Sequence, residues 1–176
     1  MTDTDRRQVY AGFEGGPNPS ERDRIVHFID IYSLTEGLTS QYLEKWAEVS
    51  PDPALRGGLR IVRDREASHS HRLKERLGEL GKTNQASIAP ERREQSFALY
   101  ASAERSDLEK LESLADLFSD PKDFMQPLVD LIVDIKDDLQ SKELLTTIMA
   151  DEYASIDWLV EMYRQRESYR NINIET

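Results

Sequence analysis

Glu66 and His69 stand three residues apart on a row of apolar residues with helical spacing. The rest of that row consists of Leu55, Leu59, Val62, Leu73 and Leu77. Residues i and i+3 of a helix project from the same face, so the carboxylate and the imidazole would point into the same interior. A buried carboxylate is costly unless it is paired or bound to a metal. Taken alone, the pair is better explained as an exposed acid beside a solvated histidine.

Three further glutamates change that balance, because each interrupts the apolar row of another long helical segment near its centre. They are Glu36, Glu104 and Glu152, and Asp107 lies three residues after Glu104 beside its row. Facing carboxylates cannot all be ionised in a dry core, and metal cations remove the repulsion. Iron and manganese suit carboxylate and imidazole ligands. The pattern therefore predicts a metal site built from four helices.

The elements that would position these residues are four long amphipathic helices. We expect them at about residues 20–49, 53–80, 90–118 and 138–166, with a short extra helix at about 124–135 between the last two. Ser20 is a suitable N-cap and Pro53 suits a first turn. No segment shows convincing strand alternation. The sequence predicts an all-α antiparallel four-helix bundle over residues 20–168, a flexible arm at 1–19 and a frayed tail at 169–176.

Composition excludes several classes of function. The formal net charge of −11 argues against nucleic acid or an anionic membrane as a partner. The absence of cysteine excludes disulfides, four-cysteine zinc sites and thiol catalysis. The sequence has no apolar run of membrane-spanning length and no apolar core near its N-terminus, so a cytoplasmic location is expected.

The order of these residues resembles the ferritin-like superfamily, particularly its bacterioferritin and rubrerythrin branches. That arrangement takes one Glu from each of two helices and a Glu-x-x-His from each of the other two. The run Asp151-Glu-Tyr-Ala-Ser-Ile-Asp-Trp-Leu159 is also similar to the bacterioferritin run Asp-Glu-Glu-x-His-Ile-Asp-Trp-Leu. The resemblance implies a ferritin-like di-metal protein with two iron ions, or manganese, that oxidises Fe(II) with O2 or peroxide, and a homodimer is expected.

The same resemblance implies a role for each candidate ligand. Glu36 and Glu152 would be terminal ligands of opposite metals, Glu66 and Glu104 would bridge them, and His69 would complete one coordination shell. A ferroxidase or peroxidase type of activity would follow.

The chain also departs from the family pattern. Ser155 stands where the second histidine belongs. Asp107 is a candidate compensating ligand; otherwise water fills the vacancy, or the site holds one metal, or none. Without cysteine there is no rubredoxin-type iron site, and the second helix has no methionine to bind haem. The inserted helix argues against a closed ferritin shell.

Two alternatives remain open from the sequence. The chain could be a ferritin-like scaffold with a degenerate metal site that works as an interaction or assembly protein. Its glutamates would then be partly protonated, or paired with Arg63, Arg65 or Lys142. The other alternative, a ferritin-like enzyme that oxygenates an organic substrate, ranks last because no substrate pocket is visible in the sequence.

Overall fold

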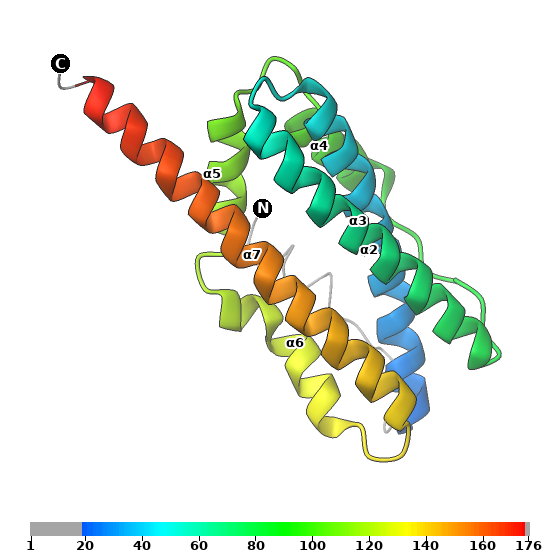
Figure 1. Ribbon diagram of the computed structural model, residues 1–176. Coiled ribbons are helices and arrows are strands. Elements are labelled where there is room, and N and C mark those ends of the chain that lie inside the picture. The colour runs from blue at the N-terminus through cyan, green and yellow to red at the C-terminus, as the bar shows by residue number, and fades with distance from the viewer. Residues whose placement is uncertain (1–18, 175–176) are drawn as a thin grey trace.

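The computed structural model of the chain describes residues 19–174 and the side chains up to residue 170. Its six helices, shown in Figure 1, are α2 (Glu21–Val49), α3 (Pro53–Glu79), α4 (Pro90–Tyr100), α5 (Asp107–Leu117), α6 (Pro121–Asp134) and α7 (Leu139–Ile174). The described residues contain no strand, so the prediction of an all-α fold is confirmed. The arm predicted for residues 1–19 falls, except for Pro19, outside the described part of the chain.

Helices α2 and α3 form a closely packed antiparallel pair, and their sequence-based bounds are confirmed. Ser20 caps α2 through a capping box, in which its hydroxyl accepts a hydrogen bond from the backbone N–H of Asp23 and the Asp23 carboxylate binds the Ser20 N–H. Asp52 caps α3 in front of Pro53, whose missing N–H costs nothing in a first turn. Beyond α3, Gly81 adopts a left-handed backbone, with φ of 69°, that a side chain would disfavour.

The continuous third helix predicted at 90–118 is wrong. The chain forms α4 and α5 instead, separated by an irregular segment over residues 101–106. Ser106 begins a new helix, because its hydroxyl accepts from the N–H of Glu109 while the Glu109 carboxylate binds the Ser106 N–H. This Ser-x-x-Glu capping box is a helix-start signal that outweighs the apolar row running through it.

The short extra helix is confirmed as α6, which begins at Pro121 rather than at 124 and contains Pro127 in its interior. Helix α7 begins as expected but continues to Ile174, whereas the sequence placed its end near Arg166 and a frayed tail from residue 169. Its C-terminal part projects beyond the other helices in Figure 1. The sequence after Arg166 contains neither proline nor glycine that would end a helix.

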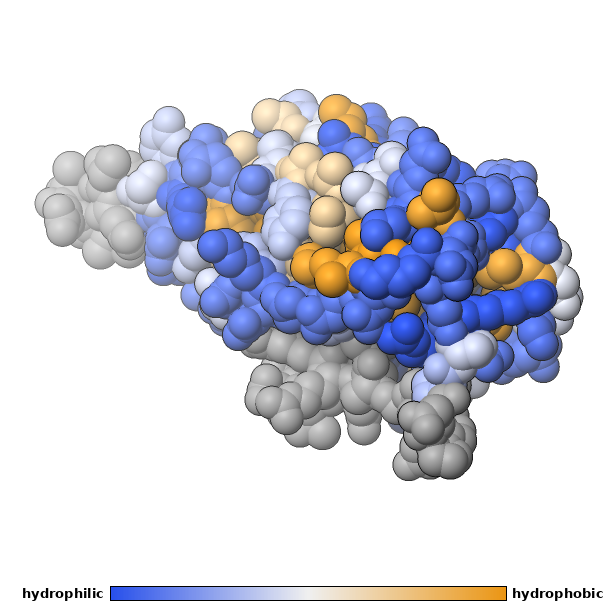
Figure 2. Space-filling model, turned by 90° about the horizontal axis from the view of Figure 1, so that it is seen from below, coloured by the Kyte–Doolittle hydropathy of each residue, from blue (hydrophilic) through white to orange (hydrophobic). Residues whose placement is uncertain are grey.

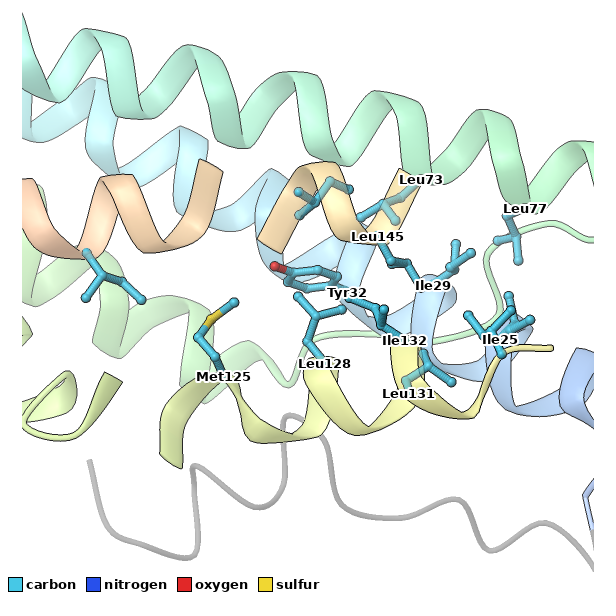
Figure 3. Packing of buried hydrophobic residues seen from close by; sticks show 13 residues of the cluster. Ile25, Ile29, Tyr32, Leu73, Leu77, Met125, Leu128, Leu131, Ile132 and Leu145 are labelled. Carbon is cyan, nitrogen blue, oxygen red and sulfur yellow. The ribbon is translucent and has the colours of Figure 1, made fainter. Parts of the chain in front are cut away.

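The apolar core consists of two clusters at different heights of the molecule. The first joins α2, α3, α6 and α7, and Figure 3 shows Met125, Leu128 and Leu131 of α6 pointing toward side chains of α2 and α7. The second joins α2, α3, α4, α5 and α7 around Trp46. Along α2 and α3, the candidate ligands lie between residues of the first cluster and residues of the second. On α7, Glu152 lies between Ile148 and Ile156 of the first cluster, and Leu159 of the second cluster follows.

On the face drawn in Figure 2 the surface is predominantly hydrophilic, and the hydrophobic residues form small separate areas. The large apolar residues that are exposed are spread over several helices: Val49, Ile61, Val133, Leu139 and Tyr169. Among the described helices, none has a stretch long and apolar enough to cross a membrane.

Candidate metal centre

Four of the predicted ligands meet inside the helix bundle. Glu36 comes from α2, Glu66 and His69 from α3, and Glu152 from α7. One potential ligand atom from each lies within 4.8 Å of the corresponding atoms of the others. Glu36, Glu66 and His69 are 3%, 4% and 1% exposed, and the side chain of Glu152 is 12% exposed. Such burial is rare for acids and requires a compensating partner.

Small residues bring α2 and α3 close together beside these side chains. A Cβ on Gly37 would approach Ser70 Oγ to 3.0 Å, and that hydroxyl donates to the Ser33 carbonyl at 2.7 Å. Gly37 follows Glu36 and Ser70 follows His69 in the sequence. The close approach therefore sets the separation of the carboxylate and the imidazole.

His69 uses its two ring nitrogens differently. Nε2 lies 3.1 Å from Asp151 Oδ2, and Nδ1 lies 3.1 Å from Glu36 Oε2 and 3.3 Å from Glu152 Oε1. With the Nε2–H donated to Asp151, the Nδ1 lone pair faces the buried carboxyl groups. This is the arrangement in which a carboxylate orients a metal-binding histidine and raises its basicity.

The buried acids hold their protons more tightly than exposed ones. Burial raises the pKa of Glu36 well above its ordinary value, and the Glu152 charge raises it further. Burial, Glu152 and Glu36 raise the pKa of Glu66 in the same way. Burial lowers the pKa of His69, but the Glu152 and Asp151 carboxylates outweigh it and the pKa rises. The centre is short of positive charge, and either protons or a metal cation can supply it.

The donor set fits one transition-metal ion. Glu152 Oε1 is buried and makes no hydrogen bond, although it lies close to His69 Nδ1. A buried acceptor without a hydrogen bond is unusual, and this oxygen is free to bind a cation. Ligand atoms about 2.1–2.2 Å from one ion lie up to about 4.4 Å apart. The four side chains would need to close by roughly 0.5 Å from their spread of 4.8 Å.

Two of the predicted ligands are not brought to this centre, which corrects the sequence-based site. Glu104 is exposed in the irregular segment between α4 and α5. Asp107 is the first residue of α5, and its carboxylate accepts hydrogen bonds from Trp46 Nε1 at 2.8 Å and from Ser50 Oγ at 2.7 Å. Asp107 therefore links α2 to α5 and is not a ligand of this centre.

Ser155 is buried one turn after Glu152, at the position of the missing second histidine. Its hydroxyl accepts a hydrogen bond from Arg65 Nη1 at 3.2 Å. Arg65 directly precedes Glu66 on α3. The position that would offer a second nitrogen ligand therefore contacts a guanidinium group.

Asp151 is the functional candidate that sequence reasoning missed. Asp151 directly precedes Glu152 in the Asp-Glu-x-x-Ser run. Its side chain is 40% exposed, as expected for an ordinary solvated acid. The signal in the sequence is that Asp151 and Glu152 are neighbours on α7, so that both carboxylates can reach His69 of α3.

A scan against protein-family models, a search of curated proteins and a search of solved structures each find no match to this chain.

Proposed function

We propose that this chain is a ferritin-like metal-binding protein that holds iron or manganese between α2, α3 and α7, and that it oxidises bound Fe(II) with O2 or peroxide. The observation that carries the proposal is the convergence of Glu36, Glu66, His69 and Glu152 in a buried centre. The consecutive helices α2 and α3 contribute to it together with α7, which is distant from them in the sequence, and the centre lies where the two apolar clusters adjoin.

The chemistry of the donors supports this choice of metals. Three carboxylates and one imidazole form a hard-to-intermediate ligand set, which suits Fe(II), Fe(III) and Mn(II). The carboxylates carry more negative charge than one divalent ion, and this surplus favours the trivalent state after oxidation. The glutamates would hold the ion and balance its charge, and a bound Fe(II) would supply the electron that reduces O2 or peroxide as the iron becomes Fe(III).

The contacts made by the nearby arginine and lysine side chains also favour a metal over ion pairs between these side chains and the glutamates. Arg63 binds Glu44 at 3.1 Å and Asp64 at 3.0 Å. Lys142 Nζ donates to the Ile135 carbonyl at 3.0 Å, and Arg65 donates to Ser155. In a purely structural centre these arginine and lysine side chains would be expected to pair with the glutamates, and the contacts above take them elsewhere.

Anaerobic loading with Fe(II), followed by desalting and metal analysis, tests the proposal. The wild type is expected to retain iron, and either Glu66→Ala or His69→Ala to lose most of it. Glu104→Ala is the matched control, because this glutamate is exposed outside the centre. On admission of air, retained Fe(II) is expected to convert to Fe(III) faster than in the buffer. A wild type that retains neither Fe(II) nor Mn(II) would overturn the proposal.

A ferritin-like scaffold without metal is the second candidate, favoured by Ser155 and by the interruption between α4 and α5. It predicts the same melting temperature with chelator as with Fe(II) or Mn(II). Metal binding predicts a rise, since a ligand at 100 times its Kd stabilises the folded state by about 2.7 kcal/mol.

A further inference from the structure

We infer that the centre holds a single metal ion and that Arg65 occupies the approach to the place where a second ion would bind. This inference rests on the proposed function, because it specifies how many ions the same side chains accept. It replaces the pair of ions implied by the family resemblance with a mononuclear centre, whose one ion lies on the His69 side.

The first argument is the number of donors. A dinuclear carboxylate centre in a bundle uses four glutamates and two histidines from four helices. Among the described residues, the centre contains three glutamates and one histidine from three helices. The two missing donors correspond to Glu104, which is exposed, and to the histidine position taken by Ser155. Each absence weakens the coordination of a second ion, while the four donors that remain suffice for one.

The second argument is the charge beside Ser155. An ion bound to Ser155 Oγ would lie about 2 Å from that oxygen. The guanidinium nitrogen Arg65 Nη1 is 3.2 Å from the same oxygen. Arginine stays protonated at any physiological pH, so it is a fixed cation at this position. A second divalent ion would have to displace it or accept a close repulsive contact.

The third argument is that the residues next to His69 and to Ser155 differ in charge. His69 is oriented from behind by Asp151, whose carboxylate lies 3.1 Å from Nε2. Ser155, by contrast, accepts a hydrogen bond from the positively charged Arg65. Within the described part of the chain, His69 is the one nitrogen donor of the cluster, and Asp151 is the carboxylate that makes it more basic.

Equilibrium dialysis with Mn(II), followed by metal analysis and low-temperature electron paramagnetic resonance, tests the inference on the wild-type chain. The expected result is one Mn(II) per chain with the six-line spectrum of an isolated ion. Two ions per chain, or the multiline spectrum of an exchange-coupled pair, would overturn the single-ion inference and leave the proposed function standing. The same measurement of ions per chain is made with Fe(II) under anaerobic conditions, and a chain that binds neither metal would overturn both the inference and the proposed function.

Variants at the second position test the role of Arg65. Ser155→His restores the histidine, and we expect it to bind one Mn(II) while Arg65 is present. Ser155→His combined with Arg65→Met is expected to bind a second ion, whereas Ser155→His with Arg63→Met is the matched control and is expected to bind one. Two ions in Ser155→His alone, or one in both double variants, would overturn the role assigned to Arg65. Melting temperatures of all variants without metal confirm that they fold.

Discussion

At the scale of single residues, His69 depends on Asp151 for its orientation. The two side chains come from different helices, and a carboxylate 3.1 Å from Nε2 favours a proton on that ring nitrogen. Asp151→Asn keeps the shape but removes the negative charge, so we expect the affinity for Mn(II) to fall by about 10–100-fold. Calorimetric titration measures this change. Asp157→Asn, at an exposed position of the same helix, is the control and is expected to leave the affinity unchanged.

Asp107 has a structural role that its sequence position did not reveal. Its carboxylate accepts hydrogen bonds from Trp46 and Ser50 and so joins the end of α2 to the start of α5. Asp107→Ala leaves the buried indole N–H without its partner, and we expect a loss of about 1–3 kcal/mol in the free energy of unfolding. Urea denaturation followed by tryptophan fluorescence measures it. Mn(II) affinity is expected to stay as in the wild type, and a large decrease would return Asp107 to the ligand set.

At the scale of elements, the packing of α7 against α3 depends on a missing side chain. A Cβ on Gly58 would overlap the ring of Trp158, whereas a Cβ on Gly57 would meet nothing within 4 Å. Gly58→Ala is expected to destabilise the fold by about 1–3 kcal/mol, because the ring has to move from its place. Gly57→Ala is expected to stabilise it by about 0.5–1 kcal/mol through helix propensity. Thermal unfolding of the two variants compares them directly, and equal effects would contradict this packing.

The sequence predicted the helices correctly where the spacing of apolar residues and the capping residues indicated the same bounds. Helices α2 and α3 have clear caps at Ser20 and Asp52 and long apolar rows, so their bounds and the inward direction of Glu36, Glu66 and His69 followed. Between residues 90 and 118 the two signals conflicted. The apolar row passes through Glu104, but the capping box at Ser106 starts a new helix there. A hydrogen-bonded cap competes directly with continuation of the helix. The spacing of apolar residues alone gives no information about this competition.

The candidate centre could be predicted only as far as helix faces determine it. The side chains of Glu36, Glu66, His69 and Glu152 were predicted to meet because each lies on the inward face of its helix. That face follows from 3.6 residues per turn. The contact between Arg65 and Ser155 could not be predicted in this way. It depends on the lateral offset and rotation of α3 against α7, which are set by Gly58 and Trp158 and by the packing of both apolar clusters.

At the scale of the whole molecule, the stability of the metal-free chain is expected to fall as the pH rises. The pKa values of Glu36 and Glu66 are raised by burial and by neighbouring acids. The folded chain therefore keeps protons that the unfolded chain loses above about pH 4.3, and that stabilisation is lost as the pH rises through the raised values. His69 acts in the same direction above about pH 6.5, because its pKa is also raised.

Carboxylates with lowered pKa values, such as Glu21 and Asp138, contribute little to the change of stability between pH 5 and 8. Backbone hydrogen bonds lower the pKa of Glu21. Burial opposes a lower pKa at Asp138, but hydrogen bonds from Ser141 and Arg76 outweigh it. A lowered carboxyl pKa stabilises the fold above the unfolded value of about 3.9–4.3, so these contributions are already complete at pH 5. Between pH 5 and 8 the slope of stability against pH therefore reports mainly on the buried centre.

Metal binding is expected to reverse this dependence. A metal ion takes the place of the protons on Glu36, Glu66 and His69, and its binding becomes more favourable as those protons become easier to remove. The rise in melting temperature produced by Mn(II) should therefore be larger at pH 8 than at pH 5, while the chelated chain melts at a lower temperature at pH 8. Calorimetry of chelated and Mn(II)-loaded samples across this range measures both slopes. A chelated chain that gains stability toward pH 8 would show that the buried acids are already ionised and paired without a metal.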